Sequence, residues 1–315
     1  MSLRALAVVF IVLPLLVGAA RSDEAFVPNQ SSDDLTILDL GAMTPGATLP
    51  IGGKPAGIAV SPDGARAYVT SPEGHFVSVI DAKARRVLKR IAVGGQPFGV
   101  AVSPDGRRLY VADMNGRELF EIDPDSEKTR RVEIGAMPSG VAATPDGRLV
   151  IAAARDDNAL VVIDAETFAR VATIAVGRHP YGATIDARGR RAYTANVESD
   201  DVSVIDLAER KLVASVPVGS HPYGVALAKG RAFVANQYAE TVSVFDTATL
   251  APLATIKVGE YPESVGVSRD GGTIYVTNWF SNDLWSIDAE SYKITGKAAT
   301  GDGPRAFGAF VRAVD

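Results

Sequence analysis

The sequence predicts an all-β fold, a seven-bladed β-propeller whose blades are four-stranded antiparallel sheets. Seven copies of one phrase carry this prediction: a turn with a proline, a short run of small apolar residues, a Ser-Pro-Asp-Gly-like turn, a Tyr-Val-Thr-Asn-like run and a Val-Ile-Asp-like run. The turn prolines are Pro55, Pro97, Pro138, Pro180, Pro222, Pro262 and Pro304, and the closing aspartates are Asp39, Asp81, Asp123, Asp164, Asp206, Asp246 and Asp288. Repeats of about 40 to 45 residues built from short β-rich segments are typical of propeller blades.

Residues 95–135 show how one repeat supplies four strands. The run 98–103 is small and apolar and ends at a Pro-Asp-Gly turn, in which proline presets φ and glycine supplies a positive φ. Three further runs, 109–113, 118–123 and 129–134, are rich in aromatic and β-branched residues and are separated by turn-forming residues. No segment sustains a helical period, so the whole repeat is expected to be β-structure.

The first and last runs of each repeat differ, and the difference places them in the ring. First runs are rich in Gly, Ala and Val, as in 57–60 and 224–227, and such small side chains suit the crowded position nearest the axis. Last runs carry charges such as Lys89 and Arg130, which discourage edge-to-edge pairing with other molecules. The first strand of each blade is therefore expected innermost and the last outermost.

The two ends of the chain predict how the ring closes. Residues 24–30 read like 231–237, and 35–39 read like 242–246, so the N-terminus begins in the middle of a repeat. The missing first strand of that repeat stands at 303–311. We therefore expect one blade that takes three strands from the N-terminus and one from the C-terminus, which pairs edges that would otherwise stay open.

The tetrapeptide that recurs in these repeats resembles the signature of the YVTN family of β-propeller repeat proteins. It stands intact at 275–278 and in variants at 68–71, 110–113, 193–196 and 233–236, and the similarity covers essentially everything after residue 23. Propellers of this kind are similar to YncE-like proteins, to the heavy chain of periplasmic amine dehydrogenases, and to the propeller domains of nitrous oxide reductase and haem d1 enzymes. The amine dehydrogenase resemblance implies a scaffold subunit without a cofactor of its own.

The N-terminus has the parts of a secretory signal. A charged start is followed by the apolar run 5–17 and by Gly-Ala-Ala, which predicts a signal peptide at 1–20, cleaved after Ala20, and one propeller domain at 21–315. The apolar run is shorter than the ~20 residues of a membrane span. We expect a periplasmic or secreted monomer without a membrane span after cleavage. The chain has no cysteine, which excludes disulfides, thiolate metal sites and covalently attached c-type haem.

The charge of the chain argues against nucleic acid as a partner. The formal net charge is −5, whereas generic binding to phosphates favours a basic surface. One basic run stands out, and it surrounds a turn between outer strands, where we interpret it as a solvated edge. Its members are Lys83, Arg85, Arg86, Lys89 and Arg90.

The loops that enter the innermost strands are the expected place of a site, because they meet at one mouth of the channel. Residues 178–182 and 220–224 repeat a His-Pro-Tyr-Gly motif in neighbouring blades, and two of the three histidines in the chain occupy it. The predicted ligand-binding residues at the channel mouth are Arg178, His179, Tyr181, His221, Tyr223, Tyr261, Glu263 and Arg305. Arg305 is expected either to bind an anionic group bidentately or to pair with Glu263 or Asp302 and fix the last strand.

Two chemistries are open to this group. His179 and His221, with a carboxylate such as Glu263, offer imidazole nitrogens and an oxygen to a divalent metal, or a set of groups for acid–base catalysis. The alternative is that the motif is repeated because repeats duplicate, with tyrosines packing at the mouth and histidines binding loop carbonyls. We therefore expect no cofactor, with a divalent metal as the one possibility.

A pair of large aromatic residues, Trp279 and Phe280, falls in the loop between second and third strands and is predicted to bind a partner, because exposed aromatics anchor interfaces. The alternative is that they fold back onto the neighbouring blade. No Gly-x-Ser-x-Gly elbow, phosphate loop or Cys-x-x-Cys-His motif occurs. The prediction is thus a binding or scaffold module for a protein partner or small ligand. A metal-assisted lactonase-like or lyase-like enzyme, or a non-catalytic subunit of a periplasmic oxidoreductase, is the alternative.

Overall fold

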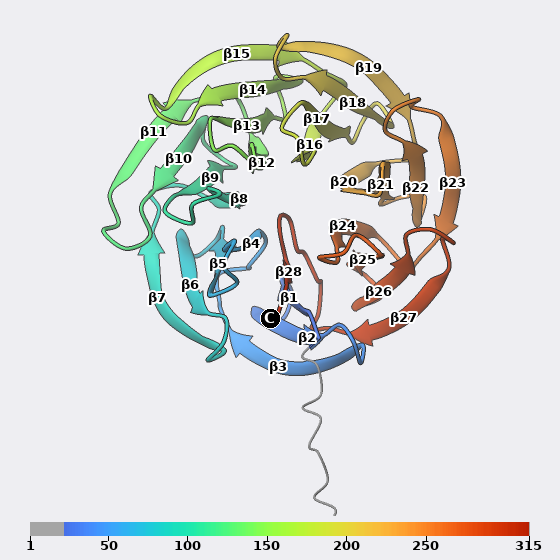
Figure 1. The fold of residues 1–315 in the computed structure, drawn as a ribbon. Coiled ribbons are helices and arrows are strands. Elements are labelled where there is room, and N and C mark those ends of the chain that lie inside the picture. Colours follow the sequence, from blue (N-terminus) through green and yellow to red (C-terminus); the bar gives the residue numbers. More distant parts are fainter. Residues whose placement is uncertain (1–21, 315) are drawn as a thin grey trace, which may run out of the picture.

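The computed structural model describes residues 22–314, which form seven four-stranded antiparallel sheets arranged as a ring around a central axis (Figure 1). Six of the sheets are built from four consecutive strands each, and we number them blades 1 to 6 in chain order. The predicted fold class is confirmed. Within residues 22–314 there is no helix that is long and apolar enough to span a membrane. The predicted signal peptide, 1–20, lies outside the described residues.

The strands of each blade follow one another from the axis outward. Blade 1 contains β4 (Ile58–Val60), β5 (Arg66–Ser71), β6 (Phe76–Asp81) and β7 (Arg86–Ala92), and blade 2 contains β8 (Pro97–Val102), β9 (Leu109–Asp113), β10 (Glu118–Ile122) and β11 (Thr129–Glu133). Blade 3 contains β12 (Pro138–Ala143), β13 (Leu149–Ala154), β14 (Ala159–Asp164) and β15 (Ala169–Ala175), and blade 4 contains β16 (Pro180–Ile185), β17 (Arg191–Asn196), β18 (Asp201–Asp206) and β19 (Lys211–Pro217). Blade 5 contains β20 (Pro222–Ala228), β21 (Arg231–Asn236), β22 (Thr241–Asp246) and β23 (Pro252–Lys257), and blade 6 contains β24 (Pro262–Val267), β25 (Thr273–Asn278), β26 (Asp283–Asp288) and β27 (Ile294–Ala299).

The seventh, closing blade is shared between the two ends of the chain, as predicted. Its strand order is β28-β1-β2-β3, with β28 (Val311–Arg312) from the C-terminus and β1 (Glu24–Asn29), β2 (Asp34–Asp39) and β3 (Thr44–Pro50) from the N-terminus. The registers of β1 with β28 pair Glu24 with Arg312. The side chains of this pair also form an ion pair, with 2.7 Å between the guanidinium and the carboxylate.

The C-terminal segment differs from the continuous strand expected at 303–311. Only Val311–Arg312 is regular, and the residues before it run near the axis of the ring, where Figure 1 shows the red end of the chain. This segment bonds to two blades at once: Phe26 donates its N–H to the Phe310 carbonyl (2.9 Å), while Ile58 donates to the Phe307 carbonyl (2.9 Å). It therefore joins the closing blade to blade 1, because N–H groups on the inner edge of the short strand β4 donate hydrogen bonds to its carbonyls.

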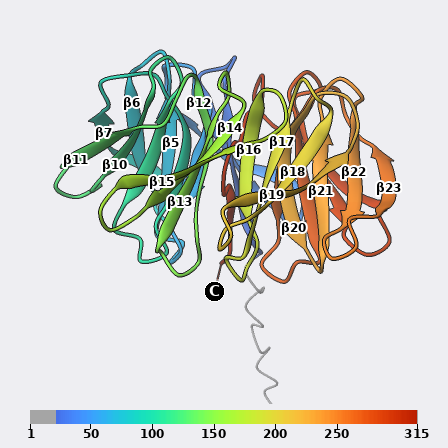
Figure 2. The same cartoon turned by 90° about the horizontal axis from the view of Figure 1, so that it is seen from above.

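The repeated polar residues hold the turns of the blades. In blade 1 the Ser61 hydroxyl donates to Asp63 (2.5 Å) and accepts from the Arg66 N–H (2.9 Å), while Gly64 adopts a φ of 66°. Asp81, at the other turn on the same face, accepts from the N–H groups of Lys83 and Ala84. These aspartates are thus turn residues, and the loops of the ring gather on two opposite faces (Figure 2).

Close packing at the axis explains the small residues of the first strands. A Cβ added to Gly99 would lie 1.9 Å from the Ser139 carbonyl oxygen of the next blade, and one added to Gly140 would lie 2.3 Å from the Tyr181 oxygen. Farther out, apolar side chains fill the space between blades, as where Val77 of blade 1 meets Val111 of blade 2 in one buried cluster. Adjacent blades therefore meet backbone to backbone at the axis.

Candidate functional site at the mouth of the ring

Seven equivalent side chains, each from the residue after a turn proline, converge at one mouth of the channel. They are Ala56, Phe98, Ser139, Tyr181, Tyr223, Glu263 and Arg305. Five of them are buried, and Tyr223 and Arg305 are partly buried. The sequence repeat thus brings one variable position from every blade to a single layer on the axis.

Aromatic rings close the channel at this level. Phe98, Tyr181 and Tyr223 are joined there by Phe307 of the C-terminal segment, and we call these four residues the aromatic floor. Its ring centroids lie 5.3 Å apart for Phe98 and Phe307, 5.1 Å for Tyr181 and Phe307, and 4.6 Å for Tyr181 and Tyr223. Burial raises the pKa of Tyr181, so its hydroxyl stays protonated. The floor is thus a largely buried aromatic layer across the axis, in which Phe98, Tyr181 and Phe307 are 2–7% exposed.

A buried ion pair completes the layer. The Arg305 guanidinium donates twice to Glu263, from Nε to Oε2 (2.7 Å) and from Nη2 to Oε1 (3.1 Å). Gln237 also donates to Glu263 (2.7 Å), and Gln30 accepts from Arg305 (3.1 Å). Burial alone would lower the pKa of Arg305, but the charge of Glu263 raises it well above its usual value. Arg305 is therefore held by Glu263 through two hydrogen bonds.

The two motif histidines lie on the rim outside this layer. Nδ1 of His179 is 3.0 Å from a carboxylate oxygen of Glu198, and Nδ1 of His221 is 3.0 Å from the Ser220 hydroxyl. Both residues have positive φ, 53° and 54°. Within the described residues Nε2 of each ring makes no hydrogen bond, so each imidazole keeps one nitrogen available.

The remaining predicted ligand residues point to other roles. Arg178 donates to the Glu198 carbonyl (2.5 Å) and so closes its own loop, and Tyr261 packs against Phe280 with 4.4 Å between ring centroids. Glu263 was expected to share a site with the two histidines. In the structure it is hydrogen-bonded to Arg305, and the histidines contact Glu198 and Ser220. In residues 22–314 no three His, Asp or Glu side chains are grouped so that they could hold a metal ion.

A second ring of mouth residues was missed by sequence reasoning. It is formed by the residue that directly follows each Tyr-Val-Thr-Asn-like run: Gln30, Pro72, Met114, Arg155, Val197, Gln237 and Trp279. Gln30 and Gln237 bind the central ion pair, and Val197 packs in the buried cluster with the aromatic floor. Arg155 belongs to the same ring of positions and pairs with the neighbouring Asp156, with 3.6 Å between guanidinium and carboxylate. This ring could have been found from the sequence by comparing, across all repeats, the residue that follows the tetrapeptide.

The two predicted partner-binding aromatics, Trp279 and Phe280, differ in their exposure to solvent. Trp279 is half-buried and donates its backbone N–H to the Tyr261 carbonyl (2.9 Å), whereas Phe280 is 51% exposed. The basic run at 83–90 is paired across blades, with Arg85 bound to Glu24 and Lys89 to Glu127. This pairing supports its interpretation as part of the blade edges.

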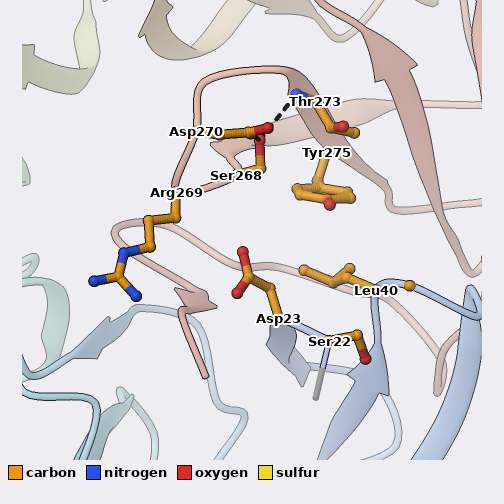
Figure 3. A pocket seen from close by; sticks show the side chains of 9 residues that line it. Ser22, Asp23, Leu40, Ser268, Arg269, Asp270, Thr273 and Tyr275 are labelled. Atoms are coloured by element: carbon orange, nitrogen blue, oxygen red, sulfur yellow. Dashed lines mark hydrogen bonds between the residues drawn. The ribbon is translucent and has the colours of Figure 1, made fainter. Parts of the chain in front are cut away.

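A separate cavity of about 670 Å³ lies on the opposite face, between blade 6 and the closing blade (Figure 3). Asp23, Arg269, Asp270 and Tyr275 line it, and the Ser268 hydroxyl holds Asp270 (2.6 Å). Burial raises the pKa of Tyr275, and the charge of Asp23 raises it further. The cavity forms where the chain ends meet, so no repeat pattern predicts it.

The fold is a seven-bladed propeller, and one variable position from every blade lies at one mouth of its channel. Two overlapping stretches, 68–184 and 155–276, match the cytochrome D1 heme domain family and together span more than half of the chain. The chain belongs to this family. No curated protein matches the sequence. No family match supports the resemblance to YVTN repeat proteins, which stays a prediction, whereas the related resemblance to haem d1 propellers is supported.

Three solved structures share the fold. Hydrazine synthase of Kuenenia stuttgartiensis aligns with a TM-score of 0.73 at 21% identity, over 81% of this chain and 89% of that chain. A functionally unknown protein from Desulfotomaculum acetoxidans DSM 771 gives 0.80 at 14%, over 90% and 99%. Dihydro-heme d1 dehydrogenase NirN in complex with DHE gives 0.70 at 19%, over 94% and 77%. At these identities the likeness concerns the fold.

The expectation of no cofactor, or of a divalent metal alone, is corrected by the family, which is defined by a haem domain. The donor set at the mouth fits such a group. Haem iron can be held by an imidazole whose other ring nitrogen bonds to a carboxylate, and Nδ1 of His179 has such a carboxylate, Glu198, at 3.0 Å. A single axial histidine leaves no spacing pattern in a sequence, which is why the motif analysis did not find a haem site.

Proposed function

We propose that this protein is a periplasmic propeller that binds a haem of the d1 class at the mouth, above the aromatic floor. The observation that carries the proposal is the contact between Nδ1 of His179 and the Glu198 carboxylate, at 3.0 Å. This contact leaves Nε2 of His179 available to ligate iron. Membership of the cytochrome D1 heme domain family supports the choice of ligand. Export rests on the signal-like residues 1–20.

The residues at the mouth divide the work of binding. His179 would supply a nitrogen ligand to the haem iron, and Glu198 would fix its tautomer by accepting from Nδ1–H. The macrocycle would lie over the aromatic floor, whose Tyr223 is only partly buried, and Arg155 would supply a cation for its carboxylates. A bound haem would supply one-electron chemistry at its iron.

The mouth supports binding better than hydrolysis. A lactonase-like or lyase-like reaction would require a carboxylate that is free to take up a proton. Glu263, the carboxylate at the axis, is 1% exposed and accepts bonds from both Arg305 and Gln237. Its role in this arrangement is to hold the floor together.

A titration of the purified protein with haem d1, followed by absorbance, tests the proposal. We expect one equivalent to bind with a shift in the haem spectrum, and His179→Ala to abolish that shift. Glu198→Gln should weaken binding by about 10- to 100-fold, because outer partners of ligating histidines contribute this much. His75→Ala is the matched control, since His75 is the third histidine and its Nδ1 faces the Gly95 carbonyl (2.9 Å) in another loop.

Two results would overturn the proposal. One is an unchanged haem spectrum on mixing with the wild-type protein. The other is equal affinity in the wild type and His179→Ala, which would remove this imidazole from the site. A spectral shift lost only in His221→Ala would transfer the axial role to the neighbouring blade and leave haem binding in place.

A further inference from the structure

A chain of ring contacts runs along the rim of blades 5 and 6. His221 stacks on Tyr238 with 3.9 Å between centroids, Tyr238 lies 5.5 Å from Tyr261, and Tyr261 lies 4.4 Å from Phe280. Trp279 follows at 4.6 Å from Phe280. We call these five residues the aromatic ridge.

The exposure of the ridge is unusual for this molecule. Tyr238 is 56% exposed and Phe280 is 51% exposed. The other exposed large apolar residues in the described part of the chain are aliphatic and lie on the outermost strands: Leu88, Leu212, Val213, Leu253 and Ile294. Scattered apolar side chains on outer strands need no explanation, but adjoining exposed aromatics on loops do.

Backbone bonds between neighbouring loops hold the ridge in place. Tyr238 donates its N–H to the Ser220 carbonyl (3.3 Å), and Phe280 donates to the Glu260 carbonyl (3.2 Å). Each aromatic loop is thereby fastened to the loop that enters the first strand of its own blade. A surface that is already ordered loses little conformational entropy when a partner binds.

The charges around the ridge have one sign. The six mouth loops at 197–200, 218–221, 237–240, 258–261, 279–282 and 300–303 contain no Lys or Arg. They carry five carboxylates, of which Glu260 and Asp302 are exposed and form no ion pair within residues 22–314. Apart from Arg305, which is paired with Glu263, the arginines of the mouth loops lie elsewhere: Arg117 and Arg155 in blades 2 and 3, and Arg178 in the loop that leads from blade 3 into blade 4. The aromatic half of the mouth is therefore acidic.

We propose that the aromatic ridge is the docking surface for a partner protein that presents Lys and Arg side chains around an apolar contact. Aromatic faces attract such cations, and carboxylates at the rim speed and orient the encounter. An anionic membrane surface does not fit, because Glu260 and Asp302 would repel it. The inference stands independently of haem binding, since the ridge contacts are seen in the protein alone.

Site-specific crosslinking in the native periplasm tests the ridge. A photoreactive phenylalanine at position 238 of the full chain should give a covalent adduct with one protein. The same group at position 88, exposed on an outer strand (41%), should give none above background and serves as the matched control. The adduct protein is then identified and purified, and its affinity for each variant is measured.

We expect Tyr238→Ser/Phe280→Ser to weaken binding of that protein by about tenfold or more, as loss of interface aromatics does. Glu260→Lys/Asp302→Lys should weaken it by a similar factor and remove its dependence on salt. Melting temperatures should stay at the wild-type value, because all four side chains are exposed. Equal adducts at both positions, no adduct at 238, or affinities within about twofold of wild type for both variants would each overturn the inference.

Discussion

Removing Arg305 tests whether the layer at the mouth depends on its ion pair. In Arg305→Met the Glu263 carboxylate, 2% exposed in its side chain, would lose both guanidinium bonds and remain buried beside Gln237 alone. Breaking a buried pair in this way costs about 3–5 kcal/mol. Unfolding of roughly 290 residues carries an entropy of about 0.6 kcal/mol/K, so the melting temperature should fall by about 5–8 °C.

The double variant Arg305→Met/Glu263→Gln is the matched control. Its glutamine keeps an oxygen for Gln237 but carries no charge, so we expect it to regain more than half of the lost free energy of unfolding. Urea unfolding of the wild type, the single and the double variant measures both effects. A single variant within about 1 kcal/mol of the wild type would refute the reasoning, since the carboxylate would then be solvated or dispensable.

Three further perturbations test the ring itself. Gly99→Ala should destabilise the protein by about 1–3 kcal/mol or more, because its Cβ would lie 1.9 Å from the backbone of blade 3. Gly94→Ala is the control, since a Cβ there meets nothing within 4 Å. Equal melting temperatures of the two variants would contradict the close packing at the axis. Deleting 303–315 should abolish cooperative unfolding followed by circular dichroism, because the segment bonds to the closing blade and blade 1; a deletion with native stability would disprove the closure. Acid should destabilise the fold: hydroxyl hydrogen bonds lower the pKa of Asp63 and Asp105, so their contribution is complete above the unfolded pKa of about 3.9 and is lost as pH falls through the folded value. Melting curves between pH 6 and 2.5 should show this loss, and an Asp105→Asn variant with an unchanged slope would speak against it.

The blades were predictable because each repeat contains the residues that form its turns. Ser61 and Asp63 form the turn that their spacing indicates, and the shared closing blade follows from the likeness of 24–30 to 231–237. The small first strands were also assigned correctly to the axis, where Gly99 leaves no space for a Cβ. Local chemistry and tertiary packing agree at these positions, so either one alone suffices to predict them.

The mouth was harder to predict because its contacts join residues that are far apart in the sequence. Arg305 lies 42 positions from Glu263 and 275 from Gln30, and no local pattern states that the three meet. Phe307 was assigned to a strand, but the segment that carries it bonds to two blades and takes its ring to the floor. Glu263 was expected beside the histidines, whereas the structure pairs it with Arg305, which was the alternative for that arginine.

The C-terminal segment therefore performs two tasks that sequence reasoning treated as separate. Its backbone closes the ring through Phe26 and Ile58, and its side chains Arg305 and Phe307 complete the layer on which a ligand at the mouth would rest. The layer at the mouth is complete only when the ring is closed, because two of its central side chains, Arg305 and Phe307, belong to the C-terminal segment. Ligand binding at the mouth is then linked to global folding and not to any single blade, since whatever binds the closed ring stabilises that closure by mass action.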